Sequence, residues 1–206
     1  MPAMTDKLHS VDFFDTQFQR QVASGDLVLN PFEKIALEYA KGAVLDLGCG
    51  LGNLALELAR KGLQVKALDG SATAIAHLNK IATEESLPLQ AEQKNLASYS
   101  LDQQYDTIIA IGLLMFFPKE RALAMLTDIQ QQVVPGGYAI INVLTEGTTF
   151  MDMFQPGHYY LFGANELTET FSRWNIVQLQ HDTFPAPGNT TKAFATLVAE
   201  KPFNLD

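Results

Sequence analysis

Two acidic residues and a glycine-rich loop carry the most specific chemistry in this sequence. The string Val44-Leu45-Asp46-Leu47-Gly48-Cys49-Gly50-Leu51-Gly52 is a short apolar run that leads into alternating glycines, and a second apolar run ends in Asp69. Glycine lets the backbone turn sharply and approach a ligand without a Cβ in the way. A carboxylate at the end of the second strand of an open parallel sheet is placed to accept hydrogen bonds from a ribose diol. The pattern predicts a nucleoside-binding βαβ unit.

The loop distinguishes between two classes of nucleoside cofactor. Dinucleotide-binding proteins use G-x-G-x-x-G at the start of a helix, so that the helix N-terminus meets a pyrophosphate. Here the spacing is Gly48-x-Gly50-x-Gly52, and Asp46 precedes the first glycine. A carboxylate beside the loop repels a pyrophosphate but favours a ligand that carries an ammonium or sulfonium group. S-adenosylmethionine (SAM) carries both, so the loop favours SAM over NAD or FAD.

The elements that must position these residues follow from periodicity and capping. Asn30-Pro31-Phe32-Glu33 predicts a helix start with an Asn N-cap and a capping box, and the helix runs to about residue 40. Apolar runs predict strands and amphipathic stretches predict helices between them. The expected strands are 43–47, 64–69, 89–93, 105–112, 138–144, 175–181 and 193–199, and the expected helices are 52–61, 72–83 (with Ser71 as N-cap), 119–131 and 164–173.

This order predicts an α/β fold, doubly wound, with a seven-stranded, mostly parallel sheet and a C-terminal antiparallel hairpin. Pro135-Gly136-Gly137 is expected to turn the chain into the fifth strand, and residues 184–189 to form the hairpin turn. Residues 145–164, which are rich in glycine, aromatic residues and methionine, are expected to form a loop that closes over the site. We expect a single domain at 43–206, with the segment and helix of residues 1–42 covering the cofactor site.

Several strings resemble the class I SAM-dependent methyltransferases, and among them the tellurite-resistance TehB-type and related small-molecule enzymes. The glycine loop and Asp69 match the first two motifs of the superfamily. The more particular strings are Gln104-Tyr105-Asp106-Thr107-Ile108-Ile109, Leu114-Met115-Phe116-Phe117, Pro135-Gly136-Gly137-Tyr138, Asn165-Glu166-Leu167 and Phe194-Ala195-Thr196-Leu197-Val198-Ala199. They occur in order over most of the chain, so the resemblance implies the Rossmann-like methyltransferase fold and SAM as cofactor, with S-adenosylhomocysteine (SAH) as its product.

The resemblance also implies roles for individual residues. Asp46 would favour the positive charge of the cofactor, and Asp69 would accept hydrogen bonds from the ribose hydroxyls. Asn95 would face the adenine amino group. The remaining residues implied at the cofactor are Gly48, Cys49 and Gly50 in the loop, Gly70 and Ser71 beside the adenine, Leu96, and Ile111 and Gly112 at the end of the fourth strand. Simpler roles stay open for some of them: Asn95 and Gly112 as turn residues, and Cys49 as a small residue in a tight turn.

The acceptor side is less well defined by the sequence. TehB-type proteins have a histidine near the last hairpin followed by arginines, and His181 matches that histidine, whereas Asp182 and Asn189 stand where the arginines are expected. Histidine can exchange a proton near neutral pH, so His181 is the first candidate for a catalytic residue and His158, in the expected lid, is the second. A surface position is the alternative for both. The loss of two cations weakens the prediction of an oxyanion acceptor.

Other residues could contribute to the site. Arg20 could meet the cofactor carboxylate, although a solvent-exposed position is the simpler interpretation. Phenylalanine and methionine side chains at 115–117 and 150–154 could form an apolar acceptor pocket or simply pack in the core.

Composition limits the partners. The formal charge of −9 and the pI near 4.8 argue against nucleic acid. With Cys49 as the only cysteine, no intrachain disulfide forms. The sequence contains neither a signal-peptide pattern nor an apolar run long enough for a membrane span, so we expect a cytoplasmic protein without membrane contact. No cluster has the spacing of metal ligands, and no metal is expected.

The sequence therefore predicts a SAM-dependent methyltransferase that acts on a small-molecule acceptor and is TehB-like. An O- or N-methyltransferase of an apolar or aromatic metabolite is one alternative, and a SAM-binding regulator without catalytic activity is another. The acceptor, the methylated atom and the oligomeric state stay open.

Overall fold

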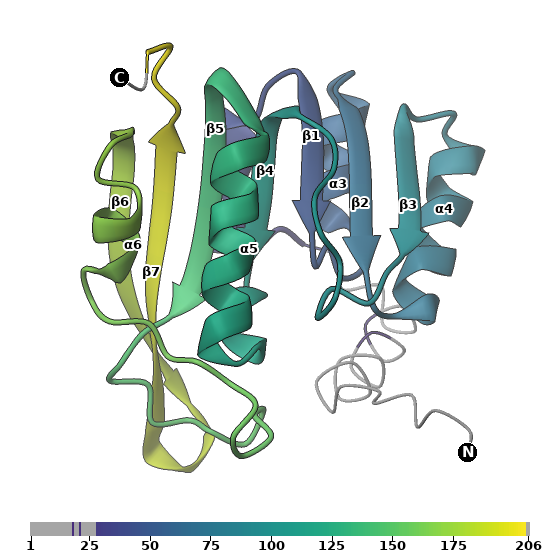
Figure 1. Ribbon diagram of the computed structural model, residues 1–206. Helices are drawn as coiled ribbons and strands as arrows, with labels where there is room; N and C mark the ends of the chain where they lie inside the picture. The colour runs from purple at the N-terminus through teal and green to yellow at the C-terminus, as the bar shows by residue number, and fades with distance from the viewer. Residues whose placement is uncertain (1–17, 19–20, 22–27, 205–206) are drawn as a thin grey trace, which may run out of the picture.

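One seven-stranded sheet organises the part of the chain that the computed structural model describes, which is Phe18, Gln21 and residues 28–204. The strand order is β3-β2-β1-β4-β5-β7-β6 (Figure 1). Neighbours among β1 to β5 run parallel, and β7 runs antiparallel to β5 and β6. The predicted fold class is confirmed. The strands are β1 (Ala43–Leu47), β2 (Gln64–Asp69), β3 (Leu89–Gln93), β4 (Tyr105–Ile111), β5 (Val133–Leu144), β6 (Asn175–Ala186) and β7 (Thr190–Glu200).

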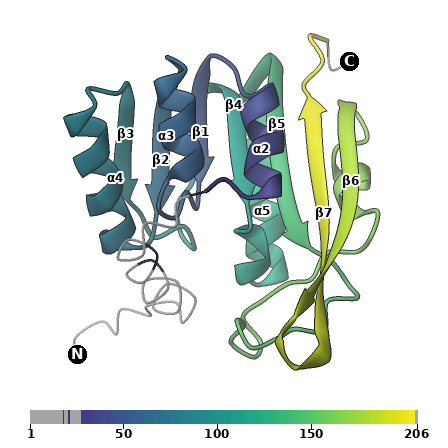
Figure 2. The same cartoon turned by 180° about the vertical axis from the view of Figure 1, so that it is seen from behind.

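Helices cover both faces of this sheet. Figures 1 and 2 show α5 and α6 on one face and α2, α3 and α4 on the other. These helices are α2 (Pro31–Tyr39), α3 (Asn53–Arg60), α4 (Ala72–Glu84), α5 (Lys119–Gln132) and α6 (Glu166–Thr170), and two 3₁₀ turns lie at η1 (Leu114–Phe116) and η2 (Pro187–Asn189). Because the strands are covered on both sides, their residues alternate between two apolar cores rather than between core and solvent.

The alternation along β5 illustrates the two cores. Ile141 and Val143 pack with α5 and α6, whereas Ile140 packs with α2 and α3. Asn142, which follows Ile140 at the same parity, faces the α2 side near the carboxyl end of the strand. The strand pattern therefore decides which polar side chains reach the ligand-binding edge of the sheet.

Local capping explains where the helices on this face begin. The side chain of Asn30 accepts hydrogen bonds from the N–H groups of Phe32 and Glu33, and Glu33 accepts the N–H of Asn30 in return. This is the predicted capping box, and it holds the first turn of α2 in place. Ser71 caps α4 by accepting the N–H of Ala74 at 3.0 Å, also as predicted.

The fifth strand is longer than the sequence predicts. It begins at Val133 rather than at residue 138, and the predicted turn at 135–137 is a bulge inside it. Val133 pairs with Tyr105 and Tyr138 pairs with Thr107, so the chain between them is looped out. Gly136 adopts a positive φ of 75° there and donates its N–H to the carbonyl of Lys201 at 2.7 Å. The glycines thus allow the backbone to form a bulge within β5 and do not mark the start of the strand.

The C-terminal region differs more from the prediction. The predicted helix at 164–173 is reduced to α6, and both hairpin strands extend beyond their expected ends to meet at η2. Pro185 pairs with Thr191 in the extension. Proline is tolerated there because β6 is an edge strand, on which a missing N–H breaks no ladder hydrogen bond. The hairpin tip and the loop at 145–165 therefore project together beyond the sheet (Figure 1).

Hydrogen bonds tie this loop to the hairpin. The N–H groups of Thr149 and Phe150 both donate to the carbonyl of Thr191, at 2.9 and 3.1 Å, and the N–H of Thr191 donates to the hydroxyl of Thr149 at 2.8 Å. The loop and the hairpin consequently form one wall next to the carboxyl ends of the parallel strands.

Candidate functional site

A cavity of about 880 Å³ runs along the carboxyl edge of the parallel strands. It extends from the loop after β3, past the ends of β2, β1 and β4, to β5 and β7. Its centre lies where the strand order reverses between β1 and β4, which is where open α/β sheets bind ligands. All eleven residues that the sequence analysis assigned to the cofactor line this cavity: Asp46, Gly48, Cys49, Gly50, Asp69, Gly70, Ser71, Asn95, Leu96, Ile111 and Gly112.

The loop between β1 and α3 is shaped by its glycines. Gly48, Gly50 and Gly52 all have positive φ angles, between 54° and 75°. A Cβ on Gly48 would lie 2.9 Å from Leu113 Cδ1, and one on Gly52 would lie 2.5 Å from Leu78 Cδ2. The N–H groups of Gly48 and Cys49 donate to the carbonyl of Leu68. The loop therefore needs glycine both for its backbone conformation and for its close packing.

Asp69 links the ends of β1 and β2. Its two carboxylate oxygens accept the N–H of Gly50 at 2.9 Å and the N–H of Ser71 at 2.8 Å. These bonds orient the carboxylate at the cavity and fix the glycine loop against the start of α4. Asp69 is thus a structural anchor of the loop and also lines the cavity.

Asp46 is a strongly perturbed carboxyl group in the cavity. Its side chain is 4% exposed. Burial raises the pKa of this carboxyl to about 8, and the neighbouring carboxylates of Glu33 and Asp69 add to the shift. Burial also raises the pKa of Glu33, against the opposing effect of its hydrogen bond from Asn30. Glu33, Asp46 and Asp69 all line the cavity, and the charges of Glu33 and Asp69 act on Asp46, which disfavours an anion there and favours a cationic ligand.

Cys49 fits the role of a small residue in the turn. Its half-buried thiol lines the cavity next to these carboxyl groups. Burial raises the pKa of the thiol well above its usual range, and the charges of Asp46 and Asp69 raise it further. A thiol with a raised pKa is a poor nucleophile.

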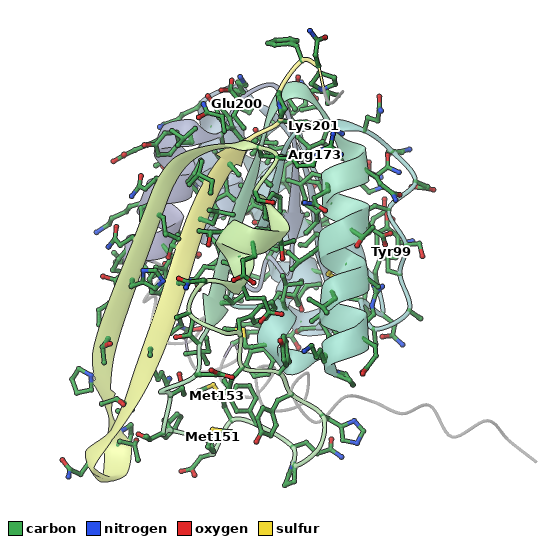
Figure 3. All side chains as sticks on the ribbon, turned by 60° about the vertical axis from the view of Figure 1, so that its left-hand side comes forward. Tyr99, Met151, Met153, Arg173, Glu200 and Lys201 are labelled. Carbon is green, nitrogen blue, oxygen red and sulfur yellow. The ribbon has the colours of Figure 1, made fainter. Side chains whose placement is uncertain are left out.

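Asn95 and Leu96 lie on the loop after β3. Leu96 is buried, whereas Asn95 is exposed and its side-chain oxygen accepts the N–H of Ala97 at 3.1 Å. Arg121 on α5 holds this loop, because its guanidinium donates to the carbonyls of Leu96 and Tyr99. Figure 3 shows Tyr99 beside α5. Arg121 was not predicted from the sequence, since nothing in a helical arginine indicates that it faces a distant loop.

Ile111 ends β4, Gly112 follows it directly, and both line the cavity. Gly112 has a φ of 65°, and a Cβ placed on it would meet no atom within 4 Å. Its N–H donates to the carbonyl of Asn142 on β5 at 3.1 Å. The glycine therefore serves a sharp backbone turn at an open part of the cavity.

Neither candidate histidine lines the cavity. His181 pairs with Ala195, whose side chain packs in the core on the α5 and α6 side. Since side chains alternate along a strand, His181 and Phe194 point to opposite faces of the hairpin, and His181 Nε2 lies 3.1 Å from the carbonyl of Ala164. His158 is exposed on the loop before Tyr159.

Several of the phenylalanine and methionine residues at 115–117 and 150–154 both pack in the core and line the cavity. Met115, Phe116 and Met153 belong to a buried apolar cluster and also face the cavity, as does Phe150. The two interpretations left open by the sequence are therefore compatible.

Residues before 43 also reach the cavity. Phe18, Gln21, Asn30, Phe32 and Glu33 are among its lining residues. Arg20 lies outside the described residues. Over the described part of the chain, no three His, Cys, Asp or Glu residues are grouped to hold a metal ion, and none of the helices is long and apolar enough to cross a membrane.

This fold and cavity define a class. A 3-2-1-4-5-7-6 sheet with an acidic residue at the end of β1, another at the end of β2 and a glycine loop between them is the arrangement of the class I SAM-dependent methyltransferases. A family model described as "Tellurite resistance protein TehB" matches residues 8–191. The chain belongs to the TehB family.

Individual relatives agree with this assignment. A probable SAM-dependent methyltransferase TehB from Haemophilus influenzae is 26% identical over 92% of this chain and 66% of its own length. "Hemagglutinin 1" from Eikenella corrodens is 32% identical over 77% of this chain and 54% of its own length. The crystal structure of TehB from H. influenzae superimposes with a TM-score of 0.70 and 25% identity, over 93% of this chain and 67% of that one. The chain spans between about half and two thirds of the length of these curated relatives.

Proposed function

We propose that this protein is a methyltransferase that uses SAM to methylate a small-molecule acceptor. The observation that carries the proposal is that Asp46, buried in the cavity wall, lies within the electrostatic influence of two further lining carboxyl groups, Glu33 and Asp69. A pyrophosphate cofactor would be repelled there, whereas SAM brings an ammonium and a sulfonium group that such carboxylates stabilise. The family membership supports the same cofactor.

The residues of the chain would hold the cofactor along the edge of the sheet. Asp69, oriented by Gly50 and Ser71, would accept hydrogen bonds from the ribose hydroxyls. Asp46 and Glu33 would balance the positive charges, and the loop at Asn95 and Leu96 would line the adenine. When bound, SAM supplies a methyl group activated by the sulfonium. The contribution of the protein is then to orient an acceptor next to the cofactor and to exclude water.

The segment and helix before residue 43 would cover the cofactor. Phe32 and Glu33 reach the cavity from α2, and Phe18 reaches the glycine loop, where its Cζ would lie 3.1 Å from a Cβ on Gly50. These contacts support a cover over the cofactor within a single domain.

We further propose that the acceptor has an apolar body and is not a small oxyanion such as tellurite. Among the described lining residues the cations are Lys94 and Lys192, and Lys94 is paired with Glu92 at 3.1 Å. The β5 and β7 end of the cavity is instead lined by phenylalanine, methionine and leucine side chains. An apolar metabolite fits such walls better than a hydrated oxyanion does.

Thermal unfolding in the presence of SAM, SAH or NADH tests the cofactor. Ligand at about 100 times its Kd adds roughly 2.7 kcal/mol to stability, or roughly 5–10 °C for a domain of this size. We expect this shift with SAM and SAH for the wild type and for a control, Glu38→Gln, on the exposed side of α2. Asp69→Ala and Asp69→Asn should lose the shift.

A shift with NADH alone, or no shift with SAM and SAH, would contradict the proposal. A protein that binds SAM but transfers no methyl group to any acceptor in a broad screen with labelled SAM would instead be a SAM-binding regulator.

A further inference from the structure

The end of the cavity under β5 and β7 carries two polar groups that the cofactor assignment leaves unused. They are Lys192, on the hairpin extension, and Asn142, near the end of β5. The walls between them are formed by Met115, Phe116, Leu144, Phe150, Met153 and Phe194. Figure 3 shows Met153 on the loop that lies at the same end of the molecule as the hairpin tip. This end therefore combines an apolar surface with two specific polar contacts, as binding sites for small molecules do.

Lys192 reaches the cavity because of the strand alternation. It lies two residues before Phe194 on β7, so both side chains point to the face opposite His181. Its ammonium group lies 4.7 Å from the centre of the Phe150 ring. No carboxylate of the described residues forms an ion pair with it. The surrounding apolar groups desolvate the amine and lower its pKa. An anion placed beside it would reverse that effect.

Asn142 presents an unpaired polar atom to the same end. Its side chain is 1% exposed, and its Nδ2 donates to the hydroxyl of Thr196 at 2.9 Å. Its Oδ1 is buried and has no hydrogen-bond partner among the described residues. A buried polar atom without a partner costs about 1–3 kcal/mol, and a ligand hydroxyl or amine that donates to it would remove this cost.

The register of the sheet sets the distance between the two groups. Asn142 pairs with Thr196, and Lys192 lies four residues before Thr196 on β7. At about 3.4 Å per residue, four residues correspond to roughly 14 Å along the strand. A ligand with a body about the size of two fused rings and a polar group at each end fits this spacing of the two residues.

We propose that the acceptor is an aromatic acid with a hydroxyl or amino group at the far end of the ring system. Its carboxylate pairs with Lys192, its ring lies between Phe150, Phe116 and Phe194, and its hydroxyl or amine donates to Asn142. Lys192 is thus a residue that determines acceptor specificity. This inference rests on the proposed function, since it takes the rest of the cavity to be filled by the cofactor.

Calorimetric titration of the SAH-saturated protein tests this assignment with three probes. They are 6-hydroxy-2-naphthoate, the neutral 6-hydroxy-2-naphthamide, and 2-naphthoate, which lacks the hydroxyl. Charge-assisted hydrogen bonds are roughly twice as strong as neutral ones. We expect the hydroxynaphthoate to bind at least tenfold more tightly than the amide and at least threefold more tightly than 2-naphthoate.

Variants of Lys192 separate its charge from its size. Lys192→Met should abolish the preference for the carboxylate over the amide, and Lys192→Arg should retain it. Lys119→Met, an exposed lysine on α5, serves as a control and should behave like the wild type. Thermal unfolding with SAH should be unchanged in all three variants, because Lys192 lies at the other end of the cavity from Asp69.

Three results would overturn the assignment: equal binding of the acid and the amide to the wild type, an unchanged preference in Lys192→Met, or no binding of any of the three probes. Each of them can occur with a normal SAH shift, in which case the cofactor proposal stands. Loss of the SAH shift in the wild type would overturn the cofactor proposal itself.

Discussion

Asp46 combines deep burial with two acidic neighbours, and this decides how it responds to a ligand. In the free protein, burial keeps the carboxyl protonated up to about pH 8, its pKa, and the charges of Glu33 and Asp69 act in the same direction. A cation beside it stabilises the ionised form and lowers the pKa. Binding of a cationic cofactor below pH 8 is therefore coupled to the release of a proton.

We predict that the affinity for SAM rises with pH between 6 and 8. Because the ionised form of Asp46 is the one that pairs with the cation, the Kd should fall by up to about tenfold per pH unit over this range. In Asp46→Asn the Kd for SAM should be larger than that of the wild type and nearly independent of pH. Calorimetry in buffers of different ionisation enthalpy measures the protons released directly. A flat pH dependence in the wild type would contradict the coupling.

The ligand-free protein provides the matching control. A folded-state pKa raised above the unfolded value of about 3.9 means that the folded state holds its proton more tightly between pH 4 and 8. The free energy of unfolding contributed by Asp46 therefore falls as pH rises through this window. The stability of Asp46→Asn relative to the wild type, measured by urea unfolding, should increase from pH 5 to pH 8.

At the residue scale, motifs with a local signature were predictable and long-range partners were not. All eleven residues assigned to the cofactor line one cavity, because each of them follows directly from a strand end or a glycine turn. Their binding roles stay predictions. Glu33 was recognised only as a capping residue, and Asn142 and Lys192 not at all. Their importance depends on which strands become neighbours, and no local pattern encodes that.

At the element scale, the alternation of side chains along the hairpin strands places His181 on the face away from the cavity. Its ring lies on the α6 side, next to the carbonyl of Ala164, although its distance in sequence from Phe194 matches the histidine of the TehB-type proteins. Sequence spacing locates a residue along a strand, but the side on which it points changes with every residue.

We predict that His181→Ala has only a small effect on catalysis. The substitution removes one hydrogen bond of an exposed ring, which contributes about 1 kcal/mol or less to the free energy of unfolding. Methyl transfer from labelled SAM to the first acceptor found by screening should stay within about twofold of the wild type. A loss of about a hundredfold or more, typical of a general acid or base, would establish the catalytic role predicted from sequence.

Arg121 is predicted to position the adenine end of the cavity from α5. Arg121→Met removes its hydrogen bonds to the carbonyls of Leu96 and Tyr99. We expect it to lower the free energy of unfolding by about 1–3 kcal/mol and to weaken SAH binding, as measured by urea unfolding and calorimetry.

Arg60→Met is the matched control for Arg121, because Arg60 pairs with Glu57 and Glu85 on the surface. Exposed ion pairs contribute about 1 kcal/mol or less, so this variant should bind SAH like the wild type. If Arg121→Met and Arg60→Met had the same free energy of unfolding and the same affinity for SAH, the loop after β3 would not depend on Arg121.

Most element boundaries followed from capping and periodicity, and the exceptions share a physical cause. The starts of α2 and α4 were predicted because Asn30 and Ser71 act through bonds to residues two or three positions away. The extent of β5 and of the hairpin was underestimated because proline and glycine suggested ends. In the structure, Pro185 occupies an edge strand and Gly136 a bulge, both of which depend on non-local pairing.

At the scale of the whole molecule, the net charge affects how ligands approach. The formal charge of the chain is −9, SAM carries one net positive charge, and SAH carries none. Attraction over distances longer than the Debye length, about 10 Å at 0.1 M salt, is screened as salt increases. We predict that the association rate of SAM falls between 20 mM and 500 mM NaCl, whereas that of SAH changes little. Stopped-flow fluorescence measures both association rates. If the rates of SAM and SAH depended equally on salt, the negative charge of the protein would not accelerate the association of SAM.

The position of β7 between β5 and β6 has a consequence for biosynthesis. β6 is made before β7, yet among the described strands its only neighbour in the sheet is β7. While the ribosome is still adding residues 190–200, β6 has no strand to pair with, and β5 has a bare edge from Tyr138 to Leu144. The half of the sheet from β3 to β4 can form during translation, but the half that carries Lys192 and Asn142 has to wait for the last strand. Nascent chains stalled before β7 should therefore expose an apolar strand edge, which makes them prone to aggregation.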